Sequence, residues 1–164
     1  MFTPKHVLVP VDFSDVSHAA VNAGLQLAAA HLAELMLLSV EEGMDHDIRE
    51  RIVTAPDDTV IEDRIRAGEQ ALEEVLRQER ARCDEAGLAL PWTDVRIQVS
   101  GGQWLDVILH EVADKQVDVV VIGTHGREKG VKGLFLSSIS ERLVARAGCS
   151  VFVVKPDGFP YLRD

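Results

Sequence analysis

The sequence predicts an α/β protein built on an open, parallel, five-stranded sheet with helices on both faces. Two observations carry this prediction. Short apolar segments rich in β-branched residues alternate with segments whose apolar residues recur at helical spacing. The resulting order, β-α-β-α-β-α-β-α-β, requires crossover connections between parallel strands, and helices cover both faces of such sheets. No repeat, linker or low-complexity segment interrupts the pattern, so we expect one domain over residues 1–164.

The five expected strands differ in how apolar they are. His6 to Asp12 is a β-branched run that we expect to be buried on both faces, ending at Pro10 and Asp12. Asp94 to Val99 alternates apolar with polar residues, which favours a position near an edge. Asp118 to Gly123 is the most strongly apolar and is expected to be one of the central strands. The remaining strands are expected at Glu34 to Val40 and Ser150 to Val154.

The helices between them are indicated by caps and by apolar spacing. Ser14 is a candidate N-cap for the first helix, and Gly87 is a plausible stop for the second. The last helix is expected at Ile139 to Ala147, whereas Glu41 to Thr59 is expected to be a loop. The inward-facing residues of the first three helices are expected to be Val16, Ala20, Ala23 and Leu27, then Ile61, Ile65, Leu72, Val75 and Leu76, then Leu105, Ile108 and Val112.

Composition limits the classes of partner. The 164 residues are 46% hydrophobic and 27% charged, with a net charge of -10. Such a surface repels nucleic acid and anionic membranes, so we expect no nucleic-acid partner and no membrane. The apolar run at the N-terminus is too short for a signal peptide. Cys83 and Cys149 match no metal spacing and are expected to be reduced, which favours a cytoplasmic location.

Ligands of open parallel sheets bind at the carboxyl ends of strands, where the strand order reverses. Two predicted strand ends carry suggestive residues, Pro10-Val11-Asp12 and Gly123-Thr124-His125-Gly126. After the second comes a loop with three basic residues, and Ser138 and Glu141 then match a capping box that opens a helix. Glycines and a helix N-terminus suit phosphate. The alternative is that the glycines only make a turn and Ser138 only caps; spacing alone leaves both open.

A family resemblance extends over nearly the whole chain. KHVLVPVDFSDVSHAA resembles the first strand and helix of the universal stress protein family, including the aspartate at the strand end. ELMLLSV resembles its second strand, and DVVVIGTHGR and ERLVARAGCSVFVVKP resemble its fourth strand and its closing helix and strand. The resemblance implies a Rossmann-like, adenine nucleotide alpha hydrolase-like fold and a regulatory protein of the stress response that binds ATP, AMP or ADP. Mg²⁺ would accompany a triphosphate.

The family's nucleotide signature is altered in this chain. The signature reads Gly-x-x-Gly, nine residues, then Gly-Ser/Thr, but nine residues after Gly126 the next position is Leu136. Aligning the capping box instead places Ser137 at the glycine position and Ser138 at the Ser/Thr position, which we prefer. A Cβ at position 137 could crowd the phosphates. Family members include some that bind adenine nucleotides and some that do not, and this sequence resembles the binding class with a weakened phosphate end.

The resemblance implies a concrete site. Asp12 is expected near the ribose and the Val40 backbone near adenine, while Asp12 as a local turn residue is the alternative. The full expected set is Val11, Asp12, Val40, Gly123, Thr124, His125, Gly126, Ser137, Ser138 and Ile139. Asp45-His46-Asp47 is interpreted as a solvated loop rather than a metal site, and Gly101-Gly102 as a strand-to-helix turn.

Three functions remain in competition. The first is a regulatory module that binds an adenine nucleotide at the carboxyl ends of the first and fourth strands. The second is a stress protein without nucleotide that acts through dimerisation and partner binding. The third is a slow ATP hydrolase, for which the sequence offers no recognisable general base. A bare apolar edge at Ser150 to Val154 favours a homodimer joined along the last strand, and the resemblance implies the same.

Overall fold

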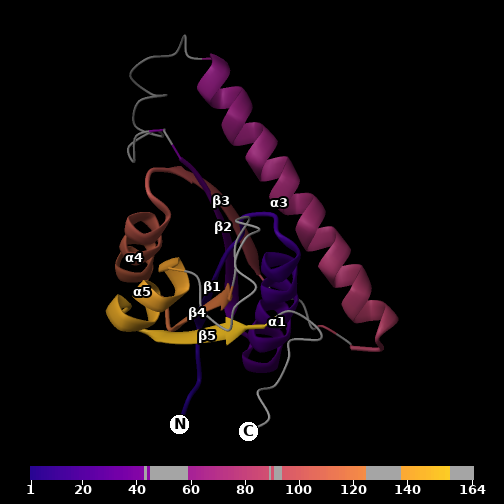
Figure 1. Cartoon of the computed structure of the whole chain (residues 1–164). Helices are drawn as coiled ribbons and strands as arrows, with labels where there is room; N and C mark the ends of the chain where they lie inside the picture. The colour runs from indigo at the N-terminus through magenta and orange to yellow at the C-terminus, as the bar shows by residue number, and fades with distance from the viewer. Residues whose placement is uncertain (43, 45–58, 89, 91–93, 125–137, 156–164) are drawn as a thin grey trace, which may run out of the picture.

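The computed structural model describes residues 1–42, 44, 59–88, 90, 94–124 and 138–155. These residues form the predicted alternation of strands and helices (Figure 1). The strands are β1 (His6–Pro10), β2 (Glu34–Glu41), β3 (Val95–Gly101), β4 (Val119–Gly123) and β5 (Ser150–Val154). The helices are α1 (Asp15–His31), α3 (Thr59–Glu85), α4 (Trp104–Asp114) and α5 (Ser138–Arg146).

All described strand pairs are parallel, and the sheet order is β3-β2-β1-β4-β5. The predicted edge position of β3 is therefore confirmed. The expectation that β4 is a central strand is confirmed, because β4 lies between β1 and β5. β4 is buried along its whole length, since helices cover both faces of the sheet there.

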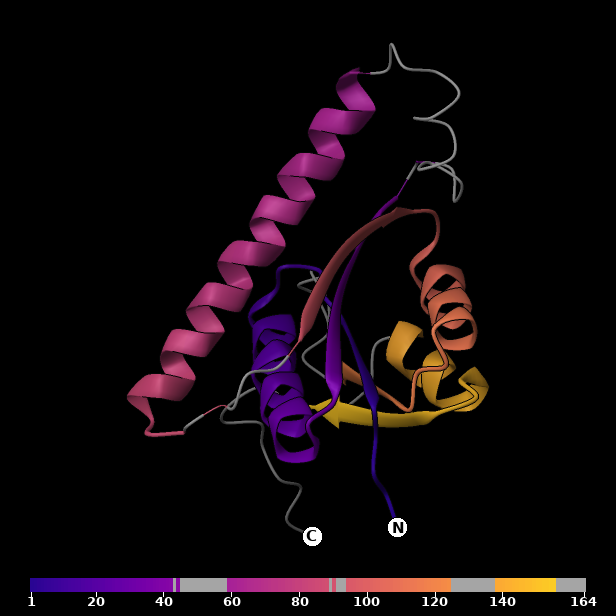
Figure 2. The ribbon, with the colours of Figure 1, turned by 180° about the vertical axis from the view of Figure 1, so that it is seen from behind.

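Helices cover both faces, as predicted. α1 and α3 pack on one face and α4 and α5 on the other, which the two opposite views make plain (Figures 1 and 2). The long α3 contacts both α1 and the edge strand β3. The apolar residues accordingly divide into two clusters: Val7, Val9 and Val121 point to the α1 side, and Leu8, Val120 and Ile122 to the other.

The buried face of α1 differs from the predicted one. Ala20 is fully buried, but Val16, Ala23 and Leu27 are only half-buried. The residues that α1 buries are Ser17, Ala20, Val21, Gly24, Leu25, Ala28 and Ala29. α1 is apolar around most of its circumference because it packs against both the sheet and α3, so helical spacing alone could not identify the face toward the sheet.

Other predicted helix features are confirmed. Ser14 is the N-cap of α1, and its side chain accepts a hydrogen bond from the Ser17 N–H. Gly87 follows α3 with a φ of 72°, the left-handed conformation that ends many helices. Ile65, Leu72 and Val75 are buried beneath α3. Within the described part of the chain, no helix has both the length and the hydropathy that crossing a membrane requires.

Candidate functional site

The strand order reverses between β1 and β4. From β1 the chain continues to β2 and β3 on one side, and later places β4 and β5 on the other. β1 and β4 are hydrogen-bonded neighbours, with Val7 beside Val119 and Leu8 beside Val120. Their carboxyl ends therefore lie side by side, at the position where open parallel sheets bind ligands. We call this region, with residues 11–14, 40 and 123–124, the switch-point edge.

Asp12 lies in a tight loop between β1 and α1. Its Oδ1 accepts hydrogen bonds from the Ser14 N–H at 3.1 Å and from the Ser14 hydroxyl at 2.6 Å. Phe13 between them has a φ of 63°, an uncommon conformation for a large side chain. This loop is why β1 ends at Pro10, two residues before the predicted end. Asp12 thus makes a local turn, which is the alternative that the sequence left open for it. A carboxylate can accept several hydrogen bonds, so this turn does not exclude a ligand.

Gly123 ends β4 directly beneath the first turn of α1. A Cβ at this position would come within 2.7 Å of Val16 Cγ1 and 3.3 Å of the Val16 carbonyl carbon. The next residue, Thr124, is buried, and its N–H donates to the Val154 carbonyl at 3.0 Å. The glycine therefore has a packing function whether or not a ligand binds, because it lets α1 begin directly over the strand end.

Val11 and Val40 can contribute only backbone groups to this edge. The side chain of Val11 is fully buried and that of Val40 nearly so. The Leu38 carbonyl accepts a hydrogen bond from the Val11 N–H at 2.8 Å, so the backbone groups of Leu38 point toward β1. Backbone directions repeat every second residue, so the Val40 N–H and carbonyl point to the same side, past the end of β1. This direction fits the expected adenine contact.

α5 begins at Ser138, one residue before its predicted first residue Ile139. Ile139 is half-buried and packs on the cluster beneath α4 and α5, while Ser140 is fully buried. Of the predicted site residues, His125, Gly126 and Ser137 lie outside the described residues, as does Asp45-His46-Asp47. The structure thus brings Asp12, Gly123 and Thr124 to adjacent strand ends. Among described residues, no cluster of acidic, histidine or cysteine side chains could hold a metal.

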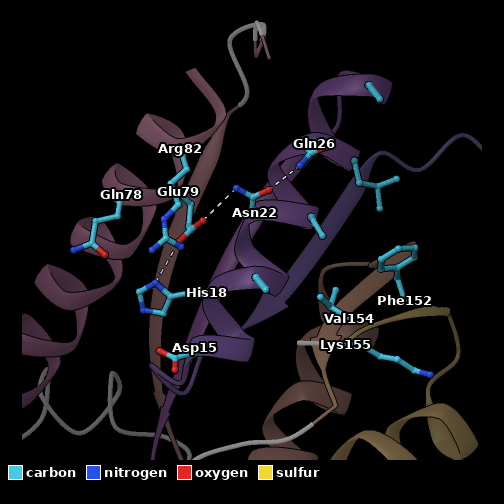
Figure 3. A pocket seen from close by; sticks show the side chains of 14 residues that line it. Asp15, His18, Asn22, Gln26, Gln78, Glu79, Arg82, Phe152, Val154 and Lys155 are labelled. Carbon is cyan, nitrogen blue, oxygen red and sulfur yellow. Dashed lines mark hydrogen bonds and ion pairs between the residues drawn. The ribbon is translucent and has the colours of Figure 1, made fainter. Parts of the chain in front are cut away.

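A second feature was not predicted from the sequence. A groove of about 1210 Å³ runs between α1, α3 and β5 (Figure 3). Its polar wall is a network around Glu79, which is 1% exposed. The Glu79 carboxylate accepts from Arg82 at 2.7 Å and Asn22 at 3.2 Å, and lies 3.3 Å from His18 Nδ1. The sequence does carry a pattern that predicts the burial of Glu79. Glu79 follows Leu72 and Val75 at helical spacing and therefore lies on the buried face of α3.

Cys83 lies one turn after Glu79 on the same stripe. It is a free, buried thiol whose Sγ accepts a hydrogen bond from Asn22 at 3.4 Å. Burial raises the pKa of the Cys83 thiol, and the Asn22 hydrogen bond opposes this only in part. A buried thiol with a raised pKa is a poor nucleophile. Cys149 is also free, so both cysteines are unpaired as expected.

Together these features define a doubly wound parallel α/β protein with its candidate ligand edge at the β1–β4 switch point. A family model described as the universal stress protein family matches residues 3–155. The chain therefore belongs to the universal stress protein family. Universal stress protein YxiE of Bacillus subtilis is 27% identical over 151 residues, which cover 91% of this chain and 97% of the relative.

Solved structures share this fold. Universal stress protein UspA from Lactobacillus plantarum superposes with a TM-score of 0.66 at 24% identity, covering 92% of this chain and 97% of that one. A universal stress protein in complex with cAMP gives 0.60 at 23% identity, covering 93% and 98%. A family protein from Arabidopsis thaliana with AMP bound gives 0.54 at 19% identity, covering 94% of both chains.

Proposed function

We propose that this universal stress protein is a regulatory module that binds ATP or another adenine nucleotide at the switch-point edge. The observation that carries the proposal is the reversal of strand order between β1 and β4, because the carboxyl ends of these neighbouring strands then lie side by side. Structures of the same fold with cAMP or AMP bound support it. Nucleotide occupancy would then bias which surface the protein presents to partners.

Each part of a nucleotide has a candidate neighbour at this edge. The Val40 backbone, which points past the end of β1, would meet adenine, and the Asp12 carboxylate would accept from ribose hydroxyls. The phosphates would lie toward Ser138, where α5 begins, because a helix N-terminus offers unpaired N–H groups and a positive dipole end. With a triphosphate, Mg²⁺ would accompany the nucleotide and offset the negative charge of its phosphates.

Two observations favour the competing function, a stress protein without nucleotide. The Ser14 hydroxyl already donates a hydrogen bond to Asp12 Oδ1. The close packing of Val16 explains why position 123 is a glycine, without any ligand. A nucleotide would then be unnecessary to explain either residue. The two functions differ in one measurable property, because only a protein that binds nucleotide is stabilised by it.

Thermal unfolding with and without millimolar ATP and Mg²⁺ separates these functions. A ligand at about 100 times its dissociation constant stabilises the folded state by about 2.7 kcal/mol. At this chain length that free energy raises Tm by about 5–10 °C. An unchanged Tm with ATP, AMP and ADP, together with no nucleotide released from the denatured purified protein, would contradict the proposal and favour the alternative.

A matched pair of variants tests the position of the site. Asp12→Ala is expected to lose at least half of the ATP-dependent rise, because the ribose loses its acceptor. Asp15→Ala removes the same charge three residues later, from the exposed first turn of α1, and should keep the full rise. Each rise is measured against the variant's own melting temperature. Turnover of ATP that Asp12→Ala leaves unchanged would assign hydrolysis to another source.

The remaining expectations are part of the same proposal. We propose that residues 1–164 form one universal stress protein domain in the cytoplasm and that two copies associate along β5. β5 is the last strand of the sheet as described, and Phe152 on it is 53% exposed. Strand edges of this kind favour pairing across a two-fold axis. Sedimentation velocity over a range of concentrations measures this association.

A further inference from the structure

Ser14 holds the Asp12 carboxylate with two hydrogen bonds to one oxygen. The Ser14 N–H and the Ser14 hydroxyl donate to Asp12 Oδ1 at 3.1 Å and 2.6 Å. The second distance lies in the range of a charge-assisted bond between a hydroxyl and a carboxylate, which is the stronger class of hydrogen bond. An aspartate side chain without such contacts exchanges among staggered rotamers. Two bonds from one residue therefore select one orientation of the Asp12 carboxylate.

The first turn of α1 fixes Ser14 in turn. The Ser17 N–H donates to Ser14 Oγ at 3.3 Å, and a backbone N–H can only donate, so the Ser14 hydroxyl accepts from α1 and gives its own hydrogen to Asp12 Oδ1. The Ser14 carbonyl accepts from the Ser17 hydroxyl at 2.8 Å and from the His18 N–H at 3.0 Å. The orientation of Asp12 is thus set by the start of α1, through Ser14.

Phe13 lies between these two residues and has a backbone conformation that large side chains rarely adopt. Its φ is 63°, and its half-buried side chain packs on the apolar cluster between the sheet and α1. On the other side of Asp12, Val11 is fully buried and its N–H donates to the Leu38 carbonyl. Strained residues persist where the surrounding structure holds them, and they are frequent at ligand sites. The loop is therefore anchored on both sides of Asp12.

We propose that Ser14 is a positioning residue of the nucleotide site and that it makes this site selective for ribonucleotides. Held by Ser14, the Asp12 carboxylate accepts hydrogen bonds from the ribose hydroxyls, and a nucleotide without these hydroxyls cannot supply them. The selectivity requires an oriented carboxylate, because a hydrogen bond weakens steeply as its angle departs from linear. This inference rests on the proposed nucleotide binding at the switch-point edge.

A Ser14 that served only as the N-cap of α1 would behave differently. Loss of a cap destabilises the helix, and it changes the affinity for every nucleotide by a common factor. Loss of a positioning residue lowers only the affinity for nucleotides that carry ribose hydroxyls. The ratio of the affinities for ATP and for dideoxy-ATP, which lacks both ribose hydroxyls, therefore separates the two roles.

Two substitutions of Ser14 isolate its hydroxyl. Ser14→Gly removes the hydroxyl, but glycine is also a favourable N-cap residue, so α1 keeps its start. Ser14→Thr keeps a hydroxyl that can both cap and donate. Isothermal titration calorimetry in the presence of Mg²⁺ gives the dissociation constants of ATP and dideoxy-ATP for the parent and both variants. We expect the parent and Ser14→Thr to prefer ATP by on the order of tenfold or more, and Ser14→Gly by less than about threefold.

The outcomes distinguish this inference from nucleotide binding itself. A parent that binds ATP and dideoxy-ATP equally well would overturn the ribose selectivity and leave nucleotide binding intact. A Ser14→Gly variant that keeps the parent's preference, or a Ser14→Thr variant that loses it, would overturn the role of the Ser14 hydroxyl. A parent that binds neither nucleotide would overturn both proposals.

Scalar couplings that report the χ1 angle of Asp12 test its orientation without any nucleotide. In the ligand-free parent we expect the couplings of a single staggered rotamer, because two hydrogen bonds hold the carboxylate. In Ser14→Gly the shorter of these bonds is absent, so the couplings should move toward averaged values. Averaged couplings in the parent, or identical couplings in the two proteins, would overturn the positioning role of Ser14.

Discussion

Val16 leaves no room for a side chain on Gly123. The Val16 Cγ1 and carbonyl carbon lie 2.7 Å and 3.3 Å from where a Cβ would stand, and real Cβ atoms do not approach other atoms as closely as the first of these distances. The contact fixes the N-terminus of α1 over the end of β4. It therefore shapes the switch-point edge before any ligand arrives, and the first glycine of the family signature has a structural function of its own.

Gly123→Ala is expected to destabilise the fold. The added methyl must displace α1 or distort β4, which costs about 1–3 kcal/mol in a packed core. Chemical denaturation of the parent and the variant measures the change. Gly148→Ala is the matched control: a Cβ there meets no atom within 4 Å, so its unfolding free energy should stay within about 1 kcal/mol of the parent. Equal stabilities for the two variants would contradict the contact.

Glu79 is expected to contribute to stability through its polar network. Glu79→Ala removes the acceptor of Arg82 and Asn22 and leaves a cavity between α1 and α3, so we expect a loss of about 1–3 kcal/mol. Glu73→Ala, an exposed glutamate on the same helix, should change stability by no more than about 0.5 kcal/mol. Urea denaturation compares the two, and a Glu79 variant as stable as the Glu73 variant would show that the network contributes nothing.

Asp118 is expected to make stability depend on pH. Its Oδ2 accepts from the Lys5 N–H at 2.7 Å and the His6 N–H at 2.9 Å. The Lys5 hydrogen bond has the largest effect and lowers the pKa of the Asp118 carboxyl below its ordinary 3.8; burial opposes it, and the His6 hydrogen bond lowers the pKa further. The ionised form therefore stabilises the fold fully above the unfolded-state pKa, and this contribution is lost as pH falls through the lower folded-state pKa.

Asp118→Asn is the variant that isolates this effect. Its unfolding midpoint in urea should lie below that of the parent at pH 6, and the difference should shrink as pH falls below about 3.8, the unfolded-state value. The carboxylate is partly exposed, so salt will weaken the effect. A difference that stays constant between pH 6 and pH 3 would show that ionisation of Asp118 does not stabilise the fold.

The sequence predicted most of the fold because its signals are local. β5 has the predicted bounds, and α5 begins within one residue of its predicted start. The order of the strands depends on long-range packing, so the apolar pattern placed β4 inside the sheet but could not identify its neighbours β1 and β5. For the same reason the spacing of Ala23 and Leu27 indicated a helix but not the side on which the sheet lies.

The candidate site was predictable only in part. Pattern and resemblance pointed to Asp12 and Gly123, which follow β1 and end β4, the two strands between which the order reverses; their role in binding stays a prediction. The sequence offered a local turn as one interpretation of Asp12, but the contact between Gly123 and Val16 depends on how α1 crosses β4, which no local pattern records. The groove was missed because it lies between elements far apart in the chain.

Backbone amide chemical shifts during a titration with ATP and Mg²⁺ test the central claim most directly, because they report both binding and its position. We expect saturable changes concentrated at Asp12, Val40, Gly123 and Ser138, with the groove residues Asn22 and Phe152 unaffected. A titration to millimolar ATP that moves none of the first four amides, or that moves only the groove, would contradict nucleotide binding at the switch-point edge.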